Sequence, residues 1–331
     1  MKTVKVAVVG LGKMGLLHSS ILNTIPNVEI VALCDKSSLL LKLVKKFFKG
    51  VRAIDDVEKL AFIDINSVYV TTPIPGHYPV IKTIISKRIA SNVFVEKTLA
   101  SSWDKARELC DSAQNLEGVN MVGYMKRFSV TFGKAKSLIA QGTLGEIASF
   151  DAYAYSSDFA RIQMASKKSG SRGGVLSDLG SHVIDLALWL FGDFDVDSAK
   201  LDSIIDESCE DSANFTVSKS GLKGNFHVSW CMSEYRMPIF GLKIIGSNGT
   251  MEVNDYTADL KMKSGKSYTW FRHDLNDNVK FLLGDPEYYR EDEVFTNSIL
   301  NGTKAEPSFK TAAKVDYIID KAKKEAEIER A

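Results

Sequence analysis

The chain has 331 residues, a length that predicts about two domains. Hydrophobic residues make up 45% and charged residues 25%, which excludes a disordered chain, and 42 basic against 41 acidic residues argue against a nucleic-acid-binding protein. No apolar run reaches the roughly 18 residues of a membrane-spanning helix, and the N-terminus lacks the apolar segment and cleavage site of a signal peptide.

Strands alternate with helices over roughly the first 120 residues. The predicted strands are Val4–Val9, Val28–Cys34, Ser67–Thr72, Asn92–Val95 and Val119–Gly123. The predicted helices run from the first glycine loop to Ile25, around Leu40–Phe48, and over His77–Ile89 and Ser101–Asn115. Apolar strands separated by helices of this length predict a parallel sheet that is covered on both faces.

After Tyr124 strands follow one another with few helices. The predicted strands are 145–155, 196–205, 211–218, 222–230, 240–246, 249–254 and 266–271, and the predicted helices are 131–141, 176–191, 287–300 and 311–329. Turn pairs at Asn248-Gly249 and Ser264-Gly265 favour antiparallel pairing. We therefore expect an α/β chain with two domains, residues 1–123 and 124–331, whose last helix is a candidate to pack back on the first domain.

The loop Gly10-Leu11-Gly12-Lys13-Met14-Gly15 follows a strand and opens a helix, and Asp35 ends the next strand. Glycines in this pattern allow a tight turn and let backbone N–H groups approach a pyrophosphate, so the segment predicts a Rossmann nucleotide-binding domain. The Asp35 carboxylate suits the ribose hydroxyls of NAD. Lys36 and the two serines after it keep NADP open, because they suit its additional phosphate.

Two further motifs carry candidate catalytic groups. Glu96-Lys97-Thr98 follows a predicted strand, where a lysine can take part in proton transfer, although most such pairs are surface charges. Asp178, His182 and Asp185 share one side of a predicted helix, so His182 is a candidate general base. An N-cap role for Asp178 and a structural role for His182 remain open. No further histidine or cysteine nearby completes a metal site, so we expect no metal.

The segment Tyr153–Arg172 is polar and rich in serine and basic residues. It is typical of a loop that contacts a polyol, a phosphorylated sugar or a nucleotide-sugar, or of a solvated loop with no ligand. Tyr155 within it and Tyr235 after a later strand are candidate substrate contacts. Four widely spaced cysteines indicate reduced thiols and a cytoplasmic protein.

Taken together, these motifs resemble the glucose–fructose oxidoreductase, inositol dehydrogenase and rhizopine catabolism family. The resemblance rests on the glycine loop, Glu96-Lys97, and Gly173-Gly-x-x-x-Asp178-x-Gly-x-His182-x-x-Asp185. It also includes Thr72-Pro73 with His77, and Val122-Gly-Tyr-Met-Lys-Arg127-Phe, so it covers essentially the whole chain.

The resemblance implies a Rossmann domain followed by an α/β domain whose open, mainly antiparallel sheet forms a homodimer or homotetramer interface. It implies reversible oxidation of a secondary alcohol on a sugar, cyclitol or sugar derivative with NAD or NADP. Lys97 would be the active-site lysine, His182 the acid/base and Asp178 the carboxylate that orients substrate, with Arg127 lining the substrate site. Thr72, Pro73, His77 and Glu96 would lie at the cofactor.

The family motif usually reads Glu-Lys-Pro, with a peptide bond before the proline that is often cis, and here Thr98 replaces that proline. Either Thr98 keeps a cis bond, or the loop relaxes to trans and aims Lys97 differently. Two alternative functions stay open: a non-catalytic redox sensor that binds the dinucleotide, and an oxidoreductase that recycles a tightly held cofactor.

Overall fold

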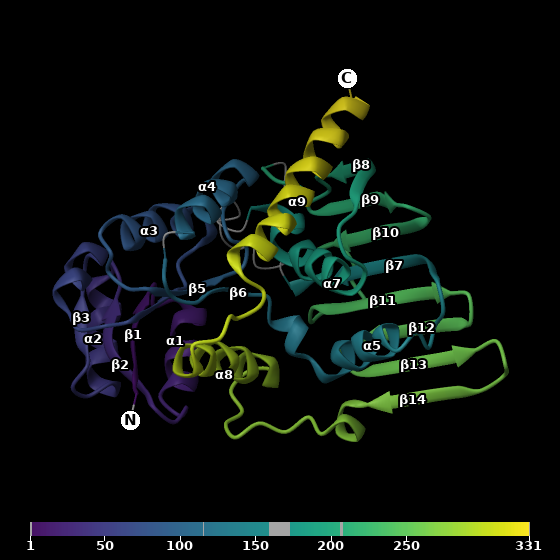
Figure 1. Cartoon of the computed structure of the whole chain (residues 1–331). Helices are drawn as coiled ribbons and strands as arrows, with labels where there is room; N and C mark the ends of the chain where they lie inside the picture. The colour runs from purple at the N-terminus through teal and green to yellow at the C-terminus, as the bar shows by residue number, and fades with distance from the viewer. Residues whose placement is uncertain (1, 115, 159–172, 206–207, 331) are drawn as a thin grey trace. The chain divides into compact units, whose positions relative to one another are not determined.

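The computed structural model describes residues 2–114, 116–158, 173–205 and 208–330, which form two compact units (Figure 1). The first unit contains Met1–Tyr124 and Val279–Asp316. The second contains Met125–Asn278 and Tyr317–Ala331. Each unit is therefore assembled from two separate stretches of chain.

The first unit is built on a six-stranded sheet with the strand order β3-β2-β1-β4-β5-β6. Its strands are β1 (Val4–Val9), β2 (Val28–Cys34), β3 (Arg52–Ile54), β4 (Ser67–Val70), β5 (Asn92–Glu96) and β6 (Asn120–Gly123). Every neighbouring pair is parallel. This order is that of a dinucleotide-binding sheet, which confirms the predicted Rossmann fold. Only β3, three residues long, was not predicted.

Five α-helices accompany this sheet among the described residues. They are α1 (Lys13–Leu22), α2 (Ser38–Phe47), α3 (Ile74–Ser86), α4 (Trp103–Ala113) and α8 (Pro286–Asn301), with a 3₁₀ turn η1 at Val57–Phe62. Helix α3 begins three residues before the predicted His77, because Pro75 fits in a first helical turn, where its missing N–H is not needed.

Helix α8 packs on the first sheet through aromatic side chains. Tyr69 of β4 and Phe94 of β5 stack with ring centroids 4.5 Å apart. Phe295 of α8 contacts both rings edge-on, at 5.4 and 5.6 Å. All three side chains are buried, so this segment from near the end of the chain is part of the core of the first unit.

The second unit is built on an eight-stranded sheet with the order β14-β13-β12-β11-β7-β10-β9-β8. The strands are β7 (Ile147–Tyr155), β8 (Asp195–Asp202), β9 (Ser212–Lys219), β10 (Leu222–Ser229), β11 (Ile239–Gly246), β12 (Gly249–Asn254), β13 (Thr257–Met262) and β14 (Ser267–Phe271). All pairs are antiparallel except β7 with β10. The mainly antiparallel sheet is thus confirmed, with β13 added to the predicted strands.

Helices cover one face of this second sheet. They are α5 (Val130–Ala140) and α7 (Ser181–Phe191), preceded by the 3₁₀ turn η2 (Met125–Phe128) and the π-helical turn η4 (Leu176–Gly180). Phe150, Ala152 and Ala154 of β7 are buried, whereas the residues between them are partly exposed. This alternation leaves the other face of the sheet without a covering helix among the described residues.

The last elements are the 3₁₀ turn η5 (Arg272–Leu275) and α9 (Phe309–Arg330), whose first residues belong to the first unit and whose remainder belongs to the second. Within the described part of the chain, no helix combines the length and the apolar character needed to cross a membrane.

Candidate functional site

The glycine loop between β1 and α1 packs closely against neighbouring backbone at Gly10 and Gly15, and it is open at Gly12. Gly10 has a φ of +97°, and a Cβ there would lie 2.7 Å from the backbone nitrogen of Thr72. A Cβ on Gly15 would lie 1.9 Å from the carbonyl oxygen of Gly10. A Cβ on Gly12, the N-cap of α1, would meet nothing within 4 Å. The glycines therefore let the loop pack against β4 while leaving space at the start of the helix.

Asp35, at the end of β2, fixes this loop. Its carboxylate accepts hydrogen bonds from the backbone N–H of Leu11 at 2.6 Å and from that of Ser37 at 2.7 Å. Ser37 caps α2, and Lys36 beside it is exposed. An open glycine turn at a helix start, with a carboxylate beside it, fits the pyrophosphate and ribose of a nicotinamide dinucleotide.

His77 connects the residues after β4 to those after β5. Its Nδ1 lies 2.7 Å from the carbonyl oxygen of Thr98, and its Nε2 lies 2.8 Å from that of Thr72. The ring is fully buried, and this burial lowers the pKa of His77 although both carbonyls oppose the shift. Pro73 is the N-cap of α3, the helix that carries His77. The structure thus brings Thr72, Pro73 and His77 together, and their contact with a cofactor stays a prediction.

Lys97 follows Glu96 at the carboxyl end of β5 and is half-buried. The backbone N–H of Lys97 donates to the Glu96 carboxylate at 3.2 Å. The peptide bond between Lys97 and Thr98 is cis, the first of the two arrangements considered for this position. The Thr98 hydroxyl donates to the carbonyl of Ala100 at 2.9 Å, and Thr98 is buried. The lysine therefore stands on a hydrogen-bonded turn at the edge where parallel sheets bind ligands.

In the second unit, the candidate acid/base residues lie on and beside α7. Asp178 is in the π-helical turn η4, and His182 is in the first turn of α7. His182 is buried, and its ring meets that of Phe240 edge-on at 5.1 Å. Single π turns occur frequently at functional sites. Asp178 lies in such a π-helical segment, directly before the regular helix that carries His182.

Arg127 and Asp185 form a buried ion pair. The guanidinium donates from Nε at 2.7 Å and from Nη2 at 2.6 Å to the two carboxylate oxygens. Asp185 thus pairs with η2, an element that helical spacing alone does not connect to it.

Lys126, the neighbour of Arg127 in sequence, is a buried lysine that no sequence motif identified as a candidate site residue. Lys126 is buried and donates to Asp255 at 2.6 Å, and its ammonium lies 4.8 Å from the centroid of the Phe240 ring. The same Asp255 accepts from the backbone N–H of Phe240 at 2.9 Å. Lys126 and His182 therefore contact the same aromatic ring. The only signal in the sequence is its position beside Arg127.

Tyr155 and Tyr235 are brought together by the second sheet. Their rings stack at 5.4 Å, and Tyr153 continues the stack at 5.3 Å from Tyr155. Both Tyr153 and Tyr155 have a raised pKa because of burial. Most of the polar segment Tyr153–Arg172 lies outside the described residues.

Comparisons with known proteins agree with this architecture. A family described as "Oxidoreductase family, NAD-binding Rossmann fold" matches residues 4–124, and the GFO/IDH/MocA C-terminal domain matches residues 132–252. Inositol 2-dehydrogenase of Rhizobium meliloti is 25% identical over 92% of this chain and 92% of its own length. D-glucoside 3-dehydrogenase of Escherichia coli is 27% identical over 57% of this chain, an alignment that spans 54% of that protein.

A solved structure of levoglucosan dehydrogenase in complex with NADH and levoglucosan superposes with a TM-score of 0.88, at 20% identity, over 99% of this chain and 98% of the other. This likeness shows the fold. The matches to both family domains cover the glycine loop, Glu96-Lys97 and the Asp178–Asp185 motif. The chain therefore belongs to the GFO/IDH/MocA family of oxidoreductases, as the resemblance in its motifs predicts.

Proposed function

We propose that this oxidoreductase is a dehydrogenase that oxidises a secondary alcohol of a sugar, cyclitol or sugar derivative. The observation that carries the proposal is a lysine, Lys97, fixed at the carboxyl end of β5 in the same unit as the open glycine loop. The names of relatives support the substrate class, because they include an inositol dehydrogenase and a glucoside dehydrogenase. We assign cofactor binding to the first unit and substrate binding to the second.

NAD is the proposed cofactor in preference to NADP. The Asp35 carboxylate bonds the backbone beside the glycine loop and carries a negative charge that repels an additional phosphate on the ribose. The exposed Lys36 is the residue that would favour NADP. Relatives of both kinds exist, since the scyllo-inositol 2-dehydrogenases of Bacillus subtilis include one named for NADP⁺ and one named for NAD⁺.

When it is bound, the nicotinamide would accept the hydride from the substrate carbon. The protein would supply the groups that remove the proton from the substrate hydroxyl. The Lys97 ammonium stabilises the negative charge that develops on the substrate oxygen, an effect of roughly 3 kcal/mol by comparison with oxyanion-hole donors. His182 accepts the hydroxyl proton, and Asp178 orients the substrate hydroxyl or the imidazole. We assign Tyr155 and Tyr235 to substrate contact.

The ion pair with Asp185 limits the ways in which Arg127 can contact a substrate. Asp185 accepts the N–H of Nε and one N–H of Nη2, which leaves the other guanidinium N–H groups for a substrate. We propose that this pair holds the wall of the substrate site, with any direct contact made through the remaining N–H groups of the guanidinium.

We further propose a homodimer or homotetramer that forms through the sheet of the second unit. One face of that sheet carries α5 and α7, and the partly exposed residues of β7 point to the other. Size-exclusion chromatography with light scattering measures the oligomeric state. Cytoplasmic location is our proposal too, supported by four cysteines that form no disulfide.

The deciding experiment follows nicotinamide absorbance with NAD⁺ or NADP⁺ and a panel of inositols, aldoses, sugar phosphates and nucleotide-sugars. Wild type is run beside Lys97→Ala and beside Lys49→Ala, a control that removes an exposed lysine. We expect turnover that falls by at least about 100-fold in Lys97→Ala and stays unchanged in the control.

The affinity for NADH, measured by fluorescence titration, should be nearly the same in all three proteins. Full activity of Lys97→Ala would refute the role of the lysine. Tight NADH binding without turnover on any substrate in the panel would instead favour the sensor function. Cofactor that stays bound through dialysis, detected by native mass spectrometry, would favour recycling of a tightly held cofactor.

A further inference from the structure

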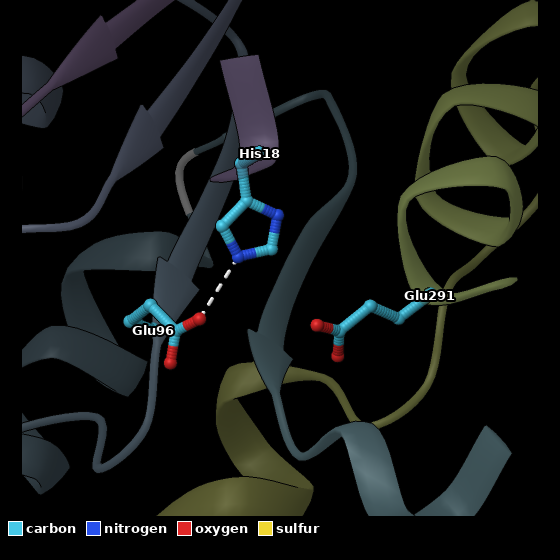
Figure 2. A group of neighbouring side chains, drawn as sticks. All are labelled: His18, Glu96 and Glu291. Carbon is cyan, nitrogen blue, oxygen red and sulfur yellow. Dashed lines mark hydrogen bonds and ion pairs between the residues drawn. The ribbon is translucent and has the colours of Figure 1, made fainter. Parts of the chain in front are cut away.

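A group of ionisable side chains is buried in the first unit. His18 comes from α1, Glu96 from the end of β5 and Glu291 from α8, and Figure 2 shows the three side chains converging. One potential ligand atom from each residue lies within 4.8 Å of the other two. The three residues are 78 or more positions apart in sequence, so the fold alone brings them together.

A fourth residue, Asp292, orients the imidazole of His18 through its Nδ1 atom. Its Nδ1 lies 2.9 and 3.0 Å from the two carboxylate oxygens of Asp292. Its Nε2 lies 2.9 Å from Oε1 of Glu96. A carboxylate at Nδ1 favours a proton on that nitrogen, so Nε2, which contacts Glu96 when no ion is bound, would present its lone pair to a bound ion. Histidines that bind metals are commonly oriented in this way.

Glu291 has no hydrogen-bond partner in the described structure. It is fully buried, and neither of its carboxylate oxygens has a partner. Its side chain points toward Glu96 and His18 (Figure 2). Buried carboxyl oxygens are almost always paired, so a pair of orphan oxygens directed at two potential ligands needs an explanation.

The charges in the group do not balance. Glu96, Glu291 and Asp292 supply three carboxylates against the single imidazole of His18. The rings of Tyr69, Phe94 and Tyr288 lie around His18, which makes the surroundings apolar. Buried charges of one sign persist only when a cation or protons neutralise them.

We propose that His18, Glu96 and Glu291 bind one divalent transition-metal ion, with Asp292 orienting the histidine. Metal–nitrogen and metal–oxygen bonds of about 2.0–2.2 Å separate adjacent ligand atoms by about 2.9 Å at a right angle and about 3.4 Å in a tetrahedron. The distance of 2.9 Å between His18 and Glu96 matches this range. One imidazole with two carboxylates suits zinc, manganese or iron better than calcium or magnesium.

Glu96 links the proposed metal site to the backbone of Lys97. Oε2 of Glu96 accepts the backbone N–H of Lys97, which leaves Oε1 for the metal. The side chain of Glu96 is 10% exposed, whereas that of His18 is not exposed, so an ion enters from the Glu96 side. A bound ion would fix the backbone at Lys97, but the site itself does not depend on the proposed dehydrogenase activity.

The rival explanation is a proton in place of a metal ion. Burial raises the pKa of Glu291 well above that of an ordinary glutamate, which favours a proton on this carboxyl when no ion is bound. The substitution Glu291→Gln separates the two explanations. Glutamine imitates a protonated carboxyl but is a poor metal ligand. The matched control is Glu293→Gln, two residues further along α8, which is partly exposed and forms an ion pair with Lys280 at 3.8 Å.

The test uses the full chain, stripped with a chelator and dialysed against Zn²⁺, Mn²⁺ or Co²⁺ in separate samples. We expect about one ion per chain by elemental analysis, visible absorption bands from bound Co²⁺, and a higher melting temperature with metal than without. Glu291→Gln should weaken binding at least about 100-fold, while Glu293→Gln should bind like wild type.

Absence of stoichiometric metal in wild type, together with an equal or higher melting temperature of metal-free Glu291→Gln, would overturn the proposal in favour of the proton. If Glu291→Gln does not fold, the Co²⁺ measurement on the wild-type protein decides between the metal ion and the proton. One Co²⁺ per chain with its visible bands supports the site, and no Co²⁺ refutes it. Neither readout depends on enzymatic activity, so a failure of the proposed function and a failure of the metal site remain distinguishable.

Discussion

Arg127 and Asp185 are 58 residues apart in sequence and form a two-pronged ion pair, with hydrogen bonds of 2.7 and 2.6 Å. Their side chains are only 7% and 1% exposed. The arginine belongs to η2 and the aspartate to α7, so the pair fixes the helix that carries His182.

Asp185→Asn leaves the arginine charge buried without its counter-charge. We expect a loss of about 3–5 kcal/mol in the free energy of unfolding of the second unit. The measurement is urea denaturation followed by tryptophan fluorescence, since Trp189 lies 5.9 Å from the guanidinium of Arg127. The double variant Arg127→Met with Asp185→Leu should be less destabilised, because it buries no charge. A cost below about 1 kcal/mol for the single variant would contradict this account.

Gly12→Ala and Gly15→Ala should affect different properties. A Cβ at position 15 meets the Gly10 carbonyl oxygen at 1.9 Å, so Gly15→Ala should lower the melting temperature and abolish cofactor binding. A Cβ at position 12 meets nothing within 4 Å, so Gly12→Ala should fold normally. It should still lose NADH affinity, because the methyl group occupies the space that the pyrophosphate needs. Unchanged NADH titration of Gly12→Ala would show that the cofactor does not approach this turn.

Asp35→Ser should shift the cofactor preference. The change removes the negative charge at the end of β2, so we expect the ratio of NADP⁺ to NAD⁺ affinity to rise at least about tenfold. The absolute affinity for NAD⁺ should also fall, since the carboxylate holds the N–H groups of Leu11 and Ser37. Asp55→Ser is the control, because Asp55 is exposed and forms an ion pair with Lys59. Dissociation constants for both cofactors give the result, and an unchanged ratio would remove Asp35 from the specificity site.

Three of the cysteines should react slowly in the native protein. Burial raises the pKa of Cys34 and Cys110 to about 12 and that of Cys231 to about 11. At pH 8 the thiolate fraction then falls roughly a thousandfold for the first two and roughly a hundredfold for Cys231. Alkylation followed by peptide mass spectrometry should label Cys231 before Cys34 and Cys110, with rates for the three that equalise in guanidinium chloride. Fast native labelling of Cys34 would refute its burial.

Much of the fold was predictable from the sequence because the signals are local. Apolar strands such as Val4–Val9 alternate with helices, and this pattern alone predicts a parallel sheet. β3 escaped prediction because it has three residues. In β13, Ala258 and Leu260 are buried, but Asp259 between them and Lys261 after them are residues that disfavour strands, so the signal in the sequence is weak.

The surroundings of the candidate site were less predictable than its motifs. The glycine loop, Asp35 and Lys97 are short segments whose spacing carries their chemistry. The partners of Lys126 and His18 lie 129 and 274 residues further along the chain, and no spacing rule connects them. Helical spacing also could not predict the partner of Asp185, because Arg127, which binds its carboxylate, belongs to another element.

The place of α8 in the first unit has a consequence for how the protein is made. His18 leaves the ribosome 274 residues before Asp292, which at about 5–20 residues per second is a delay of roughly 15–55 s. During that time the nascent sheet lacks the helix that covers Tyr69 and Phe94 with Phe295. The first 124 residues are therefore synthesised first but are among the last parts to complete their core, and they expose an aromatic surface that chaperones can recognise until α8 arrives.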